Sequence, residues 1–391
     1  MAPFEFRSVP RLVCQSGATD QLTQCLAPNL EQARLGPQAK VFFLVDPFIE
    51  STDRFSRVLS KLKDAGMDVK ICTDVEPDPP EADVIRVTEQ AMAFGAEVVI
   101  GLGGGSTLDI AKLVAILCKG EQTLGTMYGV GNVTSGRLPL VLIPTTSGTG
   151  SEVTPISIVT TGADTKMGVV SPVLYADLAI LDADWTVSLP QHVTAATGID
   201  AMVHAIEAYT SVRLKNPYSD FLACQALKLL SANLLKVCET PDDREARQAM
   251  MLGACIAGQA FANAPVGGVH ALAYPIGGIF HVSHGLSNSL VLPEVLKFNL
   301  PKAEHWYAEL ANVVNCASLG QNAHDQAEAF IEWASKLSPS TGLPSKLSGV
   351  GIKETDLDRM AESAMLQTRL LSNNPREIDQ AAARAIYAAS L

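Results

Sequence analysis

Residues 41–184 alternate short β-branched runs with amphipathic helical stretches, and few folds accommodate that order. Apolar runs without interspersed polar residues are typical of parallel strands buried on both faces, and helices between them indicate βαβ units. The expected strands are residues 41–45, 68–72, 98–100 and 140–143. The expected helices are residues 49–65 and 80–94, and Gly66 and Gly95 are expected to end them.

Strand signals stop after Pro190, and only long helical patterns follow. The expected helices are residues 195–210, 218–238, 243–262, 305–314, 324–337, 354–364 and 377–389. We therefore predict an α/β N-terminal domain with a parallel sheet at residues 1–187, followed by an all-α C-terminal domain at residues 188–391.

Charge and cysteine usage exclude several classes of protein. The chain has 29 Lys and Arg against 41 Asp and Glu, a net charge of −12, and no basic run, so nucleic-acid binding is not expected. Residues 1–7 lack a signal-peptide pattern, and the eight cysteines form no CxxC pair. These features predict a cytoplasmic protein with reduced thiols.

Residues 248–293 contain no Asp, Glu, Lys or Arg, and their length alone would allow a membrane span. Polar and helix-breaking residues interrupt them too often, however, among them Gln259 and Pro265. We therefore expect a buried core segment and no membrane association. Because a buried imidazole needs a partner, His270 and His284 within this segment become candidate functional residues.

A glycine-rich loop follows the expected strand at residues 98–100 and leads into an apolar helix at residues 110–117. Its glycines allow close approach to a ligand, the spacing of Ser106 and Asp109 fits a capping box, and the helix N-terminus suits a pyrophosphate. The loop matches neither GxGxxG nor the Walker pattern, so a ligand-free turn stays an alternative. Its candidate cofactor residues are Gly103, Gly104, Gly105, Ser106 and Asp109.

Two further strand ends carry side chains suited to a dinucleotide. Residues 144–154, Pro-Thr-Thr-Ser-Gly-Thr-Gly-Ser-Glu-Val-Thr, follow one strand with many hydroxyls, although a polar connection would look alike. Asp46 follows another, where a carboxylate accepts from a ribose diol and repels a 2′-phosphate. This favours NAD over NADP, unless Asp46 only opens the Asp-Pro turn.

Asp200 and His204 are four residues apart, so they share one face of a helix. Alone, such a pair is more often a hydrogen-bonded surface pair. Together with His270 and His284, it supplies one carboxylate and three imidazoles in one helical domain. Around a divalent ion, this set leaves a formal charge of about +1, which stabilises an alkoxide and polarises a carbonyl.

Four blocks occur in order along the chain: Gly-Gly-Gly-Ser-x-x-Asp at 103–109, Pro-Thr-Thr-x-Gly-Thr at 144–149, Gly-Ile-Asp-Ala-Met-x-His-Ala-Ile-Glu at 198–207, and residues 270–288. Together they resemble the iron-containing, group III alcohol dehydrogenase family. The resemblance implies that residues 1–187 bind NAD(P) and that residues 188–391 form the catalytic domain, with a divalent metal held by Asp200, His204, His270 and His284. It also implies NAD(P) contacts at Asp46, Gly104, Gly105, Ser106, Thr145, Thr146, Thr149, Thr154 and Lys166.

Some implied roles compete with ordinary structural ones. Lys166 reads equally as a solvated loop lysine, Phe261 as a core residue, and residues 373–376, Asn-Asn-Pro-Arg, as a surface turn rather than a loop near the substrate. Phe261 and Asn263 are the candidates to border the nicotinamide or the substrate.

Tyr274 stands where many family members carry a histidine, four residues after the third ligand. A phenol has an ordinary pKa of about 10, so an imidazole proton relay is in doubt, although Tyr274 stays a candidate catalytic residue. His281 either replaces that imidazole or is structural.

The predicted function is metal-dependent hydride transfer between a small alcohol, or hydroxy acid, and NAD(P), which interconverts alcohol and aldehyde or ketone. The metal is Fe(II) or Zn(II), since the ligand set accepts both. Rival functions are a maleylacetate-type reductase without metal, a sugar-phosphate lyase or cyclase, and a sensor that binds NAD or metal without turnover. A homo-oligomer, in the simplest case a dimer, is also expected.

Overall fold

The computed structural model describes residues 3–162 and 165–391 of the chain. They divide into two compact units: an α/β unit, residues 8–146 and 150–187, and a helical unit, residues 188–391 with 147–149 and the N-terminal residues up to Arg7. The predicted fold class, a parallel α/β part followed by an all-α part, is confirmed. No strand lies within residues 188–391, all of which the structure describes.

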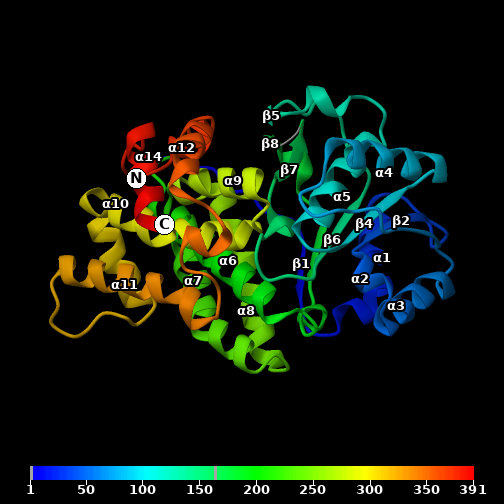
Figure 1. Ribbon diagram of the computed structural model, residues 1–391. Coiled ribbons are helices and arrows are strands. Elements are labelled where there is room, and N and C mark those ends of the chain that lie inside the picture. Colours follow the sequence, from blue (N-terminus) through cyan, green and yellow to red (C-terminus); the bar gives the residue numbers. More distant parts are fainter. Residues whose placement is uncertain (1–2, 163–164) are drawn as a thin grey trace. The chain divides into compact units, whose positions relative to one another are not determined.

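The α/β unit is built on a six-stranded parallel sheet with the strand order β1-β9-β6-β4-β2-β3 (Figure 1). Its strands are β1 (Leu12–Cys14), β2 (Lys40–Val45), β3 (Asp68–Cys72), β4 (Val98–Gly103), β6 (Leu140–Pro144) and β9 (Leu178–Leu181). Its helices are α1 (Leu22–Gln32), α2 (Pro47–Glu50), α3 (Asp53–Asp64), α4 (Glu81–Phe94) and α5 (Gly105–Leu117).

Alternate residues of each central strand enter two different hydrophobic cores. Phe42 and Leu44 pack in one core with α4 and α5, whereas Val41, Phe43 and Val45 pack in the other with α1 and α3. Helices therefore cover both faces, which explains why residues 41–45, 98–100 and 140–143 are all apolar. Burying each such side chain stabilises the fold by roughly 1.5–3 kcal/mol.

A second sheet in this unit is absent from the sequence predictions. It joins β5 (Gly129–Val130), β7 (Ile156–Thr161) and β8 (Thr165–Val170), in the order β5-β8-β7. The predicted capping box at Ser106 and Asp109 is wrong: the N-cap of α5 is Gly104, two residues before Ser106, and it makes no side-chain cap. The predicted helix ends hold, since Gly95 caps α4 in the left-handed conformation and Gly66, also left-handed, follows α3.

The helical unit contains long helices and short connections. They are α6 (Gln191–Thr210), α7 (Pro217–Glu239), α8 (Arg244–Asn263), α9 (Gly268–Phe280), α10 (His284–Val313), α11 (Ala323–Ser340), α12 (Leu357–Met365), α13 (Thr368–Leu371) and α14 (Gln380–Ser390). The prediction of only residues 305–314 for α10 was too short, because α10 continues through Pro293 and Pro301. A buried helix tolerates the lost backbone hydrogen bonds when its packing compensates for them.

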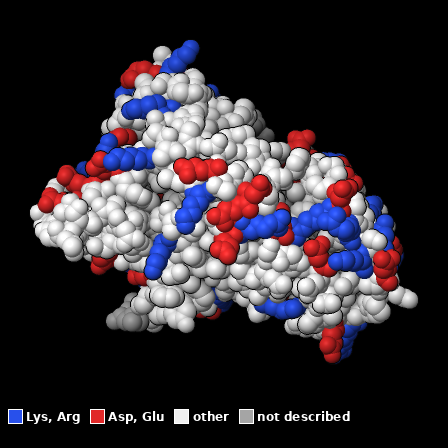
Figure 2. Space-filling model, turned by 90° about the horizontal axis from the view of Figure 1, so that it is seen from below, with Lys and Arg blue, Asp and Glu red and all other residues white. Residues whose placement is uncertain are grey.

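The uncharged segment folds as several pieces and not as one straight rod. By length and composition, α7 could cross a membrane, and so could α8 with α9 if taken as one span, although these two helices are bent by 108° at their junction. On the face of the molecule in Figure 2, basic and acidic side chains are interspersed. All eight cysteines are free thiols, three of them buried.

Candidate functional site

Helix α6 presents Asp200 and His204 on the same buried side, one turn apart. Both residues are nearly inaccessible to solvent, at 2% and 4% exposure. Alanine and β-branched residues surround them along the helix, so the helix is buried almost all round and its polar side chains must find partners within the protein.

The other two histidines lie at the beginnings of two helices. His270 is in the first turn of α9, and His284 is the first residue of α10. Gly285 allows α10 to approach α6, because a Cβ atom at Gly285 would lie 2.3 Å from the Ala196 carbonyl oxygen and 3.3 Å from the Asp200 Cβ. The ligand positions thus depend on a close helix crossing.

The four side chains form one cluster whose potential ligand atoms all lie within 4.8 Å of one another. The Asp200 Oδ1 atom is 3.9 Å from His270 Nε2 and 3.6 Å from His284 Nε2. Atoms bound at 2.0–2.2 Å to one tetrahedral ion lie about 3.4 Å apart. Small movements of these side chains would therefore bring all four donors to bonding distance of one ion. In addition, the buried Nδ1 atom of His204 has no hydrogen-bond partner among the described residues. The cluster therefore fits a divalent metal.

The electrostatics of the cluster keep its donors in the metal-binding form. Burial lowers the pKa of His204 to about 3, so this imidazole is neutral near pH 7. Burial alone would raise the pKa of Asp200, but His204, His284, His270 and the Asn288 amide outweigh it and lower this pKa below its ordinary value. A carboxylate and a neutral imidazole are the species that bind metal.

We expect metal-free protein to lose stability steeply in mild acid. His204 has a pKa of 6.5 in the unfolded state and about 3 in the folded state. Between these two pH values, the unfolded protein therefore binds a proton at His204 and the folded protein does not. The free energy of unfolding should therefore fall by about 1.4 kcal/mol per pH unit from this side chain alone. Urea unfolding at several pH values measures this slope, and a His204→Gln variant provides the control because its side chain does not titrate. Equal slopes in the two proteins would contradict the assignment.

Aromatic rings cover the cluster on several sides. The Phe261 ring stacks on His204 with centroids 4.4 Å apart, and His204 in turn stacks on His270 at 4.7 Å. Tyr274 lies 6.0 Å from His284 between ring centroids, so its phenol is near the cluster. His281 is exposed and ends α9 in the left-handed conformation. The amide of Asn263 bonds the main chain of Arg7, which makes it a tether for the N-terminal residues.

Two residues near the cluster escaped the sequence predictions. The Glu207 carboxylate lies 2.5 Å from His270 Nδ1. The Asn288 amide nitrogen donates to Asp200 Oδ1 at 2.6 Å and lies 3.2 and 3.3 Å from the Nε2 atoms of His270 and His284. A weak signal existed for both: Glu207 is three residues after His204, and Asn288 is four residues after His284, so each shares a helix face with a ligand.

In the α/β unit, three predicted cofactor loops meet at the carboxyl edge of the sheet. The Asp46 N–H donates to the Leu102 carbonyl at 3.0 Å, and the Thr145 N–H donates to the Gly103 carbonyl at 3.0 Å. The first turn of α5 has no side-chain cap, so its N–H groups are available to an anion. Asp46 also caps α2, where one carboxylate oxygen accepts from the Phe48 N–H. This edge fits a dinucleotide.

Other predicted cofactor residues have structural partners. The buried Lys112 amine donates to Ser151 Oγ at 2.7 Å, contacts Thr154 Oγ1 at 3.3 Å and pairs with Asp109 at 3.3 Å. Lys166 is in strand β8 and pairs with Asp78 at 2.5 Å, so it is not a solvated loop lysine. Contacts of these residues with a cofactor stay predictions. Thr149 belongs to the helical unit, and Thr146 lies beside Gly104.

Two family models match the chain: "iron-containing alcohol dehydrogenase" over residues 10–183 and "Fe-containing alcohol dehydrogenase family, C-terminal" over residues 194–391. Long-chain-alcohol dehydrogenase 1 of Geobacillus thermodenitrificans is 40% identical over 96% of this chain and 93% of its own. Sulfoacetaldehyde reductase of Bilophila wadsworthia is 37% identical over 86% of this chain and 88% of its own. A crystal structure of 1,3-propanediol oxidoreductase superposes with a TM-score of 0.94 at 30% identity, covering both chains fully.

Proposed function

Because the chain belongs to the iron-containing alcohol dehydrogenase family, we propose that it interconverts a small alcohol and the corresponding aldehyde or ketone with NAD(P). The observation that carries the proposal is the cluster of Asp200, His204, His270 and His284, whose ligand atoms lie within 4.8 Å of one another. Its completeness argues against a metal-free, maleylacetate-type reductase.

The bound groups would supply the reaction chemistry: the divalent cation lowers the pKa of the alcohol hydroxyl or polarises the carbonyl, and the nicotinamide accepts or delivers hydride. The chain's own residues hold these groups. Asp200 supplies the only negative charge of the ligand set, and the three imidazoles complete it without cancelling the positive charge of the ion. Phe261, stacked on His204, keeps one side of the cluster apolar and dry.

Several finer assignments belong to the same proposal. Asp46 favours NAD over NADP, Fe(II) and Zn(II) are both compatible with the donor set, and the Tyr274 phenol is the candidate to hydrogen-bond substrate or cofactor. A homo-oligomer and a cytoplasmic location complete the proposal. Light scattering on the purified protein measures the oligomeric state.

An assay of purified, metal-loaded protein tests the activity. We expect loss of reduced-nicotinamide absorbance with aliphatic aldehydes of increasing chain length, or with aldehydes that carry a carboxylate or sulfonate, and a higher kcat/KM with NADH than with NADPH. With the matching alcohols and the oxidised cofactor, the absorbance of reduced nicotinamide should rise. No turnover across the panel, despite measurable NAD binding, would instead favour a sensor.

A further inference from the structure

We propose that Glu207 is a positioning residue that holds His270 with its Nε2 atom turned toward the metal centre. The proposal rests on the proposed function, because it presumes a metal at the Asp200 cluster. Glu207 lies on α6, seven residues after Asp200 and on the same side of the helix, and it is 5% exposed.

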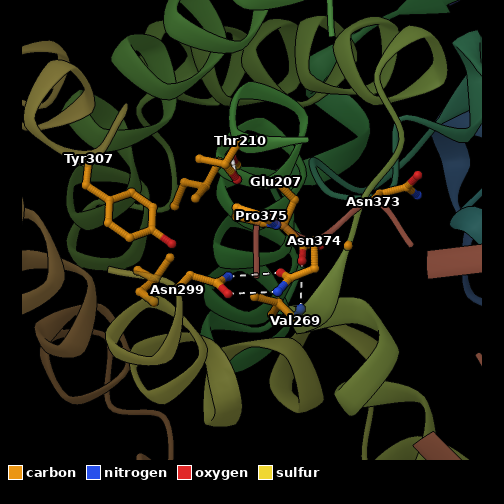
Figure 3. Close-up of a pocket in the computed structure, with 11 residues that line it drawn as sticks. Glu207, Thr210, Val269, Asn299, Tyr307, Asn373, Asn374 and Pro375 are labelled. Carbon is orange, nitrogen blue, oxygen red and sulfur yellow. Dashed lines mark hydrogen bonds between the residues drawn. The ribbon is translucent and has the colours of Figure 1, made fainter. Parts of the chain in front are cut away.

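Both oxygens of the Glu207 carboxylate contact α9. Oε1 accepts a hydrogen bond from the Val269 N–H at 2.6 Å, and Oε2 lies 2.5 Å from His270 Nδ1. Among the described residues, Glu207 forms no ion pair with Lys or Arg. Figure 3 shows Glu207 above Val269, with the hydrogen bond between them. Both oxygens of the Glu207 carboxylate are therefore occupied, one by the candidate ligand His270 and the other by its neighbour Val269.

This contact decides which nitrogen of His270 carries hydrogen. A carboxylate only accepts hydrogen bonds, so Nδ1 must be the donor and Nε2 keeps its lone pair. The Nε2 atom lies 3.9 Å from Asp200 Oδ1, on the metal side of the ring. Metal-binding histidines usually donate their other ring N–H to a carboxylate or carbonyl, which fixes both the ring orientation and the tautomer.

A pair of hydrogen-bonded asparagines holds the first turn of α9, which carries His270. Asn374 and Asn299 join their amides through hydrogen bonds of 2.7 and 2.9 Å (Figure 3). The Gly268 N–H also donates to Asn374 Oδ1 at 3.3 Å. A Cβ atom at Gly268 would lie 2.7 Å from Asn374 Oδ1, so the turn before α9 packs tightly on this pair. Asn373 and Asn374 are therefore buried residues and not part of a surface turn, although Arg376 of the same loop is exposed. Asn374 holds the start of α9, from which His270 reaches Glu207.

The space behind Glu207 is too small for any ligand of the carboxylate larger than a water molecule. The pocket lined by Glu207, Asn299 and Tyr307 has a volume of about 10 Å³, enough for about one water molecule. Tyr307 is fully buried there, and burial raises the pKa of its phenol above the ordinary value, so it stays neutral. None of the described residues that line this pocket is a Lys, Arg or His that could pair with the Glu207 carboxylate in place of His270.

The test compares Glu207→Gln with Glu309→Gln, the same substitution at an exposed carboxylate that accepts from the Tyr209 hydroxyl in the same unit. The glutamine at position 207 retains one acceptor for the Val269 N–H but turns an amide NH₂ toward His270. Zn(II) or Co(II) affinity of the metal-free protein, measured by chelator competition, should fall about 10- to 100-fold in Glu207→Gln and stay within about twofold in Glu309→Gln. Glu207→Asp, which keeps the acceptor, should recover part of the loss.

A second readout does not require metal. In metal-free wild-type protein labelled with ¹⁵N-histidine, His270 should carry hydrogen on Nδ1, and in Glu207→Gln its proton should move to Nε2. Unchanged affinity in Glu207→Gln, or an Nε2-protonated His270 in the wild type, would overturn the proposal. If the wild type bound no metal, the proposed function would fail. The contact between Glu207 and His270 would still be tested, because the tautomer of His270 is measured in metal-free protein.

Discussion

An Asp200→Asn enzyme is expected to lose its metal and at least about 10³-fold in kcat/KM. The change removes the only anionic donor, so three neutral imidazoles are left to compensate a dication. Metal-assisted charge stabilisation is worth several kcal/mol, and every 1.36 kcal/mol corresponds to tenfold in rate. Steady-state reduction of an aldehyde by NADH, together with metal analysis of the same sample, measures both losses.

Asp220→Asn provides the control for that experiment. Asp220 is a half-buried carboxylate on α7 that pairs with Lys215 at 2.6 Å, away from the cluster. Its replacement should leave metal content and kcat/KM unchanged. An Asp200→Asn protein that kept its metal and more than about a tenth of the wild-type kcat/KM would remove Asp200 from the metal site.

Replacing Gly285 with alanine is expected to lower the free energy of unfolding by about 3 kcal/mol and to weaken metal binding. The new methyl group would meet the Ala196 carbonyl oxygen at 2.3 Å, and a backbone atom cannot rotate away as a side chain can. Helix α10 must then shift from α6, which separates His284 from Asp200. Urea unfolding of the metal-free protein and chelator competition measure the two effects.

Gly277→Ala is the matched control, because a Cβ atom at Gly277 would lie no closer than 3.4 Å to any neighbour, at the Val282 carbonyl oxygen. Alanine is also the better helix former by about 1 kcal/mol, so this variant should be neutral or slightly stabilised. If both variants were equally stable, the close crossing would not restrict residue 285.

Sequence patterns predicted the helices and strands that have a clear local pattern of apolar residues. Residues 41–45 of β2 and the residues of β4 and β6 carry no polar side chain because helices cover both faces of the sheet, and that signal is local. Strand β1 has only three residues, β7 is Ile-Ser-Ile-Val-Thr-Thr and β8 is Thr-Lys-Met-Gly-Val-Val, so none of the three offers a run of four apolar residues or a sustained polar–apolar alternation. Helix α10 was cut short in the prediction because Pro293 and Pro301 normally end helices, whereas here burial maintains the helix.

The same reasoning separates the predicted from the unpredicted parts of the site. His270 and His284 attracted attention because imidazoles are costly in an uncharged buried segment. Glu207 lies on a different helix, 63 residues before His270, and a single sequence contains no measure of that distance in space. Likewise, Asn299 and Asn374 are 75 residues apart in the chain, so their buried pairing could not be predicted, although residues 373–376 were already a candidate loop near the substrate.

The four donors come from three helices and from positions between 200 and 284 of the chain. A nascent polypeptide still missing α10 offers an ion at most three of them, without the packing that brings them together. Metal insertion is therefore expected to follow synthesis of α10, the last of the three helices that carry the donors. The fraction of molecules that bind added metal is then expected to report how many have packed α6, α9 and α10 together.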